Sequence, residues 1–101
     1  MAAGVQAGET TQGRQSVAIG NQSGQTDQGD ESVAIGYLAG TTNQNTGAIS
    51  IGYQAGNNTQ SSGDVAIGYE AGEFTQGVDA ISIGRLAGQY SQGADAILLV
   101  D

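Results

Sequence analysis

β-branched residues recur along the chain in a short motif, Val/Ile–Ala/Ser–Ile–Gly, that returns every 16 residues. Successive side chains of a strand point to opposite faces, so the two β-branched positions share one face and the small residue takes the other. The pattern predicts a short strand that buries its Val and Ile side chains and turns its Ala and Ser side chains toward a neighbouring chain. The β-branched columns are Val17, Val33, Ile49, Val65, Ile81 and Ile97, and Ile19, Ile35, Ile51, Ile67, Ile83 and Leu99.

The period divides the chain into six repeats and a short remnant. The repeats are residues 1–16, 17–32, 33–48, 49–64, 65–80 and 81–96, and the remnant is 97–101; together they form one repeat domain, 1–101. A helix is excluded because the two glycines of each repeat would cost about 1 kcal/mol apiece in one. The apolar spacing of two residues also argues for strands. We therefore predict an all-β fold, a parallel β-solenoid whose six coils stack about 4.8 Å apart and rise about 29 Å.

Glycine occupies the fourth and eighth positions of every repeat. These glycines are expected to bend the backbone with positive φ. They are Gly4 and Gly8 in the first repeat, then Gly20, Gly24, Gly36, Gly40, Gly52, Gly56, Gly68, Gly72, Gly84 and Gly88. A less regular column at position 13 holds Gly13, Gly29, Gly77 and Gly93, with Asn45 in the third repeat. Asn tolerates the left-handed region best after Gly, which assigns this column a backbone role as well.

One polar column never varies: Gln12, Gln28, Gln44, Gln60, Gln76 and Gln92. In a stack of coils, identical amides can hydrogen-bond to one another along the axis, as they do in cross-β structures. We predict a structural ladder, either an internal row of amides or a clamp on a turn. A ligand-binding row of amides is the alternative.

A second column is aromatic. Tyr37, Tyr53 and Tyr69 occupy position 5 of three successive repeats, and Arg85 follows one repeat later. The rings are expected to stack, with the Arg85 guanidinium over the ring of Tyr69. Stacking that shields the coil edges is one interpretation, and a strip that contacts a receptor or sugar is the other.

The composition argues against an enzyme and against nucleic acid. The net charge is −8, with ten acidic residues and two basic ones, whereas phosphate binding needs clustered cations. The chain has no His and no Cys, which removes the common nucleophile–base pairs and zinc sites. Asp79 and Asp95, with Glu31 in register, form the only suggestive acidic column, and we expect a solvated edge there. No cofactor and no metal are expected. No membrane insertion is expected either, since no segment is long enough to span a bilayer.

Self-association is expected because the predicted core is thin and the open ends of the coil leave strand edges unpaired. The Ala/Ser face suits a close contact between copies. We therefore predict a homo-oligomer that uses this small-residue face as its interface.

The segments SVAIGYLAG, DVAIGYEAG and AISIGYQAG resemble the head repeats of trimeric autotransporter adhesins, the YadA-like head family. The longer unit AIGYxAGxxxQG is similar to repeats in fibre-like proteins of phages and large viruses. The resemblance covers residues 17–96. It implies a left-handed parallel β-roll, a homotrimer, and a place in a larger fibre protein, extracellular or on a virion surface.

These observations predict a non-catalytic fibre or adhesin head module. The alternative is a glycan- or receptor-binding adhesin tip that uses the tyrosine column or the polar turns Thr10-Thr11, Thr26-Asp27 and Thr42-Asn43. Ice binding is disfavoured because Asn58, Phe74 and Tyr90 interrupt the Thr array. Two Asn-x-Ser/Thr sequons, beginning at Asn21 and Asn57, are expected to be chance matches in a chain so rich in Asn and Ser.

Overall fold

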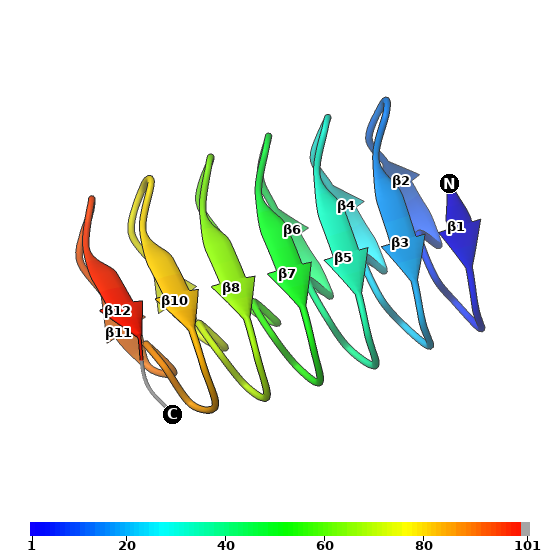
Figure 1. The fold of residues 1–101 in the computed structure, drawn as a ribbon. Coiled ribbons are helices and arrows are strands. Elements are labelled where there is room, and N and C mark those ends of the chain that lie inside the picture. Colours follow the sequence, from blue (N-terminus) through cyan, green and yellow to red (C-terminus); the bar gives the residue numbers. More distant parts are fainter. Residues whose placement is uncertain (100–101) are drawn as a thin grey trace.

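The computed structural model describes residues 1–99, which form a parallel β-solenoid of about six turns (Figure 1). No helix occurs in this part of the chain, so none is available to cross a membrane. The predicted fold class is confirmed. The longest dimension is 29 Å, in agreement with the rise expected from six stacked coils.

One wall of the solenoid is a seven-stranded parallel sheet, which runs along the whole stack. In order, its strands are β1 (Ala2–Ala3), β3 (Val17–Ile19), β5 (Val33–Ile35), β7 (Ile49–Ile51), β8 (Val65–Ile67), β10 (Ile81–Ile83) and β12 (Ile97–Leu99). Every strand is in register with the strand one repeat away, so that Ala18 pairs with Ala34. Identical repeat positions therefore form straight rows along the axis.

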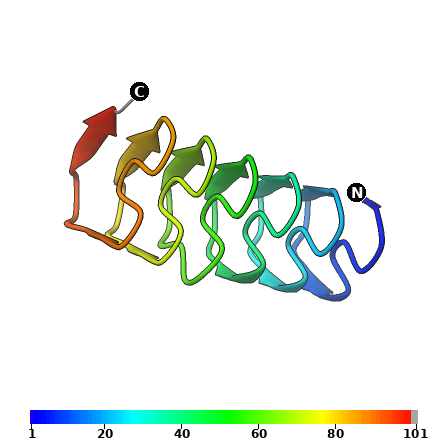
Figure 2. The same cartoon turned by 90° about the horizontal axis from the view of Figure 1, so that it is seen from below.

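The opposite wall is shorter and interrupted (Figure 2). It comprises a three-stranded sheet of β2 (Thr10–Gln12), β4 (Thr26–Gln28) and β6 (Thr42–Gln44), and a pair of β9 (Thr75–Gln76) and β11 (Ser91–Gln92). Isolated bridges at Gln60 join Gln44 to Gln76 and complete the wall. The predicted polar turns that begin at Thr10, Thr26 and Thr42 are thus wrong, because these residues open strands.

The interior of the solenoid is lined by the small residues. Ala18, Ala34, Ser50, Ala66 and Ser82, the central residues of their strands, are all completely buried. The flanking Val and Ile side chains are half-buried or exposed, so the predicted orientation of the strand is wrong. The Ala/Ser face meets the opposite wall of its own coil. It therefore cannot serve as an interface between chains.

The reason for this inversion is the narrowness of the coil. Nε2 of Gln28, on one wall, reaches the backbone carbonyl of Val17, on the other wall, at 2.7 Å. A Cβ on Gly72, in the turn between the two walls, would lie 3.1 Å from the Cβ of Ala66. With the walls this near to each other, the lumen accepts Ala, Ser and the glutamine side chains, and has no room for branched residues. Close packing leaves little tolerance for an added methylene.

The glycines at positions 4 and 8 have positive φ, as expected from the sequence. Gly20, at position 4, has φ of 122°, and a Cβ there would also lie 2.8 Å from the backbone of Gly36 in the next coil. The position-13 glycines have a different role, because neither Gly29 nor Asn45 has positive φ. A Cβ on Gly29 would lie 2.6 Å from the backbone of Asn45, and one on Gly13 would lie 2.4 Å from that of Gly29, so close approach to the next coil accounts for glycine at this position of the first two coils.

Candidate functional site

The invariant glutamines project into the lumen and bind backbone carbonyls of the opposite wall. Nε2 of Gln28 donates to the carbonyl of Val17 at 2.7 Å, and Nε2 of Gln60 donates to that of Ile49 at 2.8 Å. Gln44 repeats this contact in the coil between them. In the first coil the equivalent carbonyl, that of Met1, accepts from Nε2 of Gln12 and also from the backbone amide of Ala18. The glutamine amide thus adds a hydrogen bond that links the shorter wall to a strand carbonyl of its own coil.

The glutamine row is only partly an amide ladder. Gln44 donates to Oε1 of Gln60 at 3.3 Å, and Ser50 lies between these two amides, accepting from Gln44 and donating to Gln60. Gln28, Gln44, Gln60 and Gln76 are at most 1% exposed, which leaves them no surface for a ligand. Gln12 binds the carbonyl of Met1 in the first coil, and the side chain of Gln92 lies outside the described residues.

The tyrosine column lies on the outside, on a repeated tight turn. In the turn from Gly20 to Ser23 the amide of Ser23 donates to the carbonyl of Gly20 at 3.2 Å, and Gln22 has φ of 59°. Positive φ at the third residue alone is characteristic of a type II turn. The same turn recurs in the later coils, and its second residue is Asn21, Tyr37, Tyr53, Tyr69 and Arg85 in succession.

The tyrosine rings stack as their register requires. The centroids of Tyr37 and Tyr53 are 5.6 Å apart with the ring planes at 13°, and those of Tyr53 and Tyr69 are 4.9 Å apart at 14°. The guanidinium carbon of Arg85 lies 5.3 Å from the centroid of Tyr69. The rings cover one another's faces, so the column presents ring edges and hydroxyl groups to solvent. A sugar that needs an open ring face finds one only at the end of the stack, on Tyr37.

Acidic groups lie beside the C-terminal end of this column, near Tyr69. The negative charge of Glu70 raises the pKa of the Tyr69 hydroxyl above its ordinary value. Glu70 and Glu73 both accept from Nε2 of Gln89, at 2.8 and 3.3 Å. Burial raises the pKa of Glu73. Within residues 1–99, no three acidic, His or Cys side chains converge in a way that could hold a metal ion.

The outer surface of the seven-stranded sheet is the second candidate surface. We use the term outer apolar face for the two columns of Val, Ile and Leu side chains that begin at Val17 and Ile19. In coils two to five these side chains are half-buried, and Ile83 is 40% exposed. Sequence reasoning placed them inside. The central position of each strand is Ala or Ser in every repeat. This restriction was the available sequence signal that the central residue faces the lumen, because only a confined site excludes larger residues in every repeat.

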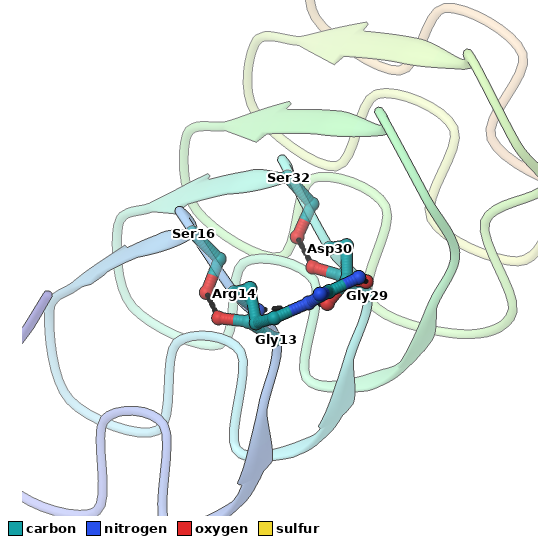
Figure 3. A network of polar contacts seen from close by, with 6 residues as sticks. All are labelled: Gly13, Arg14, Ser16, Gly29, Asp30 and Ser32. Atoms are coloured by element: carbon teal, nitrogen blue, oxygen red, sulfur yellow. Dashed lines mark hydrogen bonds and ion pairs between the residues drawn. The ribbon is translucent and has the colours of Figure 1, made fainter.

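An ion pair joins the first two coils at another edge (Figure 3). The backbone amide of Arg14 donates to Asp30 at 2.7 Å, and the guanidinium donates to the other carboxylate oxygen at 3.1 Å. These contacts, the backbone one foremost, lower the pKa of Asp30. Arg14, Gln15, Asp30 and Glu31 line a shallow depression, but Arg14 is almost fully exposed there, and exposed ion pairs contribute little stability. We infer that the pair helps to hold the irregular first coil against the second.

A buried carboxyl group lies in the fourth coil. Asp64 is fully buried and accepts from the backbone amides of Ser61 at 2.6 Å and Ala80 at 3.0 Å. Burial raises its pKa to about 6 despite these two hydrogen bonds. The acids expected to form a solvated edge, Asp79 and Asp95, are exposed.

No family model, curated protein or solved structure matches the chain. The likeness to adhesin heads and viral fibres consequently rests on the repeat motif alone. The fold itself, a β-solenoid with 16-residue repeats, is established by the structure.

Proposed function

We propose that this protein is a non-catalytic structural module of a surface fibre, in which three copies associate along their outer apolar faces. The observation that carries the proposal is the row of half-buried to exposed Val, Ile and Leu side chains that runs along the seven-stranded sheet from β3 to β12. A sheet face that met only water would carry polar residues at these positions. Extended apolar surface of this kind is characteristic of an interaction site.

The distribution of charge supports self-association through this face. The two columns of the outer apolar face contain no charged residue from Val17 to Leu99, although the chain has a net charge of −8. All acids lie on other columns, and the exposed ones among them keep the remaining surface soluble. A location outside the cell or on a virion surface fits such a rod-shaped display module.

The mass of the purified protein in solution tests this proposal. The chain has a mass of 10.1 kDa, so light scattering at several concentrations should give about three times that value, close to 30 kDa. A mass of one chain at every concentration would overturn the trimer. The function would then have to be sought on a monomeric solenoid.

A glycan- or receptor-binding adhesin tip is the second candidate, favoured by the tyrosine column. Tyr37, Tyr53 and Tyr69 are 39–47% exposed, although they stack, and Arg85 adds a cation at one end. Screening the trimer against immobilised glycans tests this candidate. Binding that is lost in Tyr37→Ala and kept in Gln25→Ala, on another column, would support it, and absence of binding throughout would leave the column a structural stack.

A further inference from the structure

The two sequons differ sharply in their structural setting. Asn21 is exposed at the tip of a tight turn, and its side-chain amide has no partner among residues 1–99. Asn57 is half-buried, and its Nδ2 donates to the carbonyl of Leu38 at 3.2 Å. A substituent on Nδ2 of Asn57 would have to displace this contact between coils. A substituent on Asn21 would project into solvent and would leave every backbone contact of the turn in place.

Asn21 also lies beside the open end of the tyrosine stack. The backbone amide of Leu38 donates to the carbonyl of Asn21 at 3.1 Å, which places Asn21 and Tyr37 in the same register as Tyr37 and Tyr53. Tyr53 covers one face of the Tyr37 ring. The other face is turned toward Asn21, and Tyr37 is 47% exposed. A flat group carried by Nδ2 of Asn21 would lie against this free aromatic face, one coil spacing away.

The geometry points to Asn21 as the acceptor of an N-linked glycan whose first sugar packs against Tyr37. In the transfer, Nδ2 forms a bond to the anomeric carbon of a lipid-pyrophosphate-linked oligosaccharide. The bond from that carbon to the phosphate oxygen breaks, the lipid pyrophosphate leaves, and the amide loses one proton. The hydroxyl of Ser23, which completes the sequon, is buried and donates to the carbonyl of Gly20 at 3.0 Å. The transfer therefore takes place before this coil closes.

The packed sugar would act as one more flat layer on the tyrosine stack. It would cover the open face of Tyr37, as Arg85 covers Tyr69 at the other end. The expected consequence is a higher melting temperature for the glycosylated protein. Self-association uses a different surface, so this inference does not depend on the number of chains in the assembly.

Expression through a eukaryotic secretory pathway tests the acceptor site. The full chain is fused to a C-terminal tag that carries an independent sequon, so that glycosylation of the tag reports entry into the lumen. We expect the secreted protein to carry one glycan on the solenoid, lost in Asn21→Gln and kept in Asn57→Gln. An unmodified Asn21 beside a modified tag would overturn the proposal, and so would equal occupancy of Asn57.

The contact with Tyr37 has its own readout. Trimming the glycan to its first sugar should leave the raised melting temperature unchanged, and removing the whole glycan should lower it. In Tyr37→Ala the glycosylated and unglycosylated forms should melt at the same temperature. If the glycan raised the melting temperature equally with and without the Tyr37 ring, the packing of the sugar on that ring would be disproved. Tyr90→Ala, which removes an exposed ring elsewhere, serves as the control.

Discussion

At the scale of single residues, non-glycine residues with positive φ recur at the same places of successive coils. Position 15 is the clearest example, since Gln15, Glu31, Asp79 and Asp95 have φ of 56–60°. In the third and fourth coils the same position is Gly47 and Gly63, with φ of 72° and 74°. The left-handed region costs an ordinary residue roughly 1–2 kcal/mol. The fold thus requires a left-handed backbone conformation at position 15, and only two of the repeats have glycine there.

Replacing Glu31 by Gly should therefore stabilise the protein. The relief of the left-handed conformation exceeds the extra flexibility of the unfolded glycine chain, which costs roughly 0.5–1 kcal/mol, so a net gain of about 0.5–1 kcal/mol is expected. Urea denaturation measures it. Glu31→Ala is the matched control, because it removes the same charge and keeps the Cβ. An equal gain in both variants would refute the backbone explanation.

Two glycines distinguish the cost of a positive φ from the cost of a steric clash with an added Cβ. A Cβ on Gly47 would touch nothing closer than 3.9 Å, whereas one on Gly52 would lie 2.7 Å from the carbonyl oxygen of Gly68. Gly47→Ala should cost about 1 kcal/mol of unfolding free energy, for the positive φ alone. Gly52→Ala should cost more than about 4 kcal/mol, within the severest class of single substitutions. Similar losses in the two variants, measured by thermal unfolding, would contradict this assignment.

Asp64 should make the protein less stable at neutral than at mildly acidic pH. Its folded pKa of about 6 lies above the ordinary 3.8, so the group takes up a proton on folding. Its contribution is most favourable below pH 4, and as the pH rises through 6 the unfolding free energy should fall by about 3 kcal/mol in all. Asp64→Ser introduces the residue found at Ser16 and Ser32 and should abolish this fall. A pH profile of unfolding that is unchanged in the variant would disprove the role of Asp64.

At the scale of the element, each coil is held together by one glutamine that spans its two walls. The side chain reaches from the shorter wall to a carbonyl of the seven-stranded sheet and leaves space only for Ala or Ser beside it. Oε1 of Gln44 is buried without a hydrogen-bond partner among the described residues. In the next coil Ser50 donates to Oε1 of Gln60. A hydroxyl at position 2 therefore completes the hydrogen bonding of the amide in the same coil.

Ala34→Ser should supply that missing donor. By register with Ser50, the new hydroxyl would lie between Gln28 and Gln44, and would satisfy Oε1 of Gln44. A gain of about 1 kcal/mol in unfolding free energy is expected from one added buried hydrogen bond. Ala39→Ser serves as the control, because it buries the same hydroxyl at the repeat position of Ser23, whose hydroxyl donates to a backbone carbonyl and not to an amide oxygen. Destabilisation by Ala34→Ser alone would show that the lumen has no room for the hydroxyl.

At the scale of the whole molecule, the solenoid turns its apolar columns outward over the length of a 29 Å rod. A charge on this face should interrupt association between copies and leave each coil intact, because the side chains there do not fill the lumen. Ile35→Lys combined with Ile67→Lys should lower the mass in solution from three chains to one, with an unchanged circular dichroism spectrum. Ser62→Lys, which adds a charge at an exposed edge, should leave the mass unchanged. An assembly that survives the double substitution would not use this face.

The sequence by itself determined the period, the parallel pairing, the register and the stacking of like residues, since each follows from local repetition and from strand geometry. The left-handed bends at Gly20 and Gly24 were also predictable, because few other residues accept that backbone.

Only the tertiary structure decided which face of each strand lies inside. An alternating pattern such as Val33–Ala34–Ile35 is compatible with either orientation, and hydrophobicity favoured the wrong one. The distance between the walls of a 16-residue coil is set by closure of the whole turn, and that distance admits Ala and Gln and excludes Ile. The contact of Asp64 with Ala80 and that of Asn57 with Leu38 likewise join neighbouring coils, and no local pattern records them.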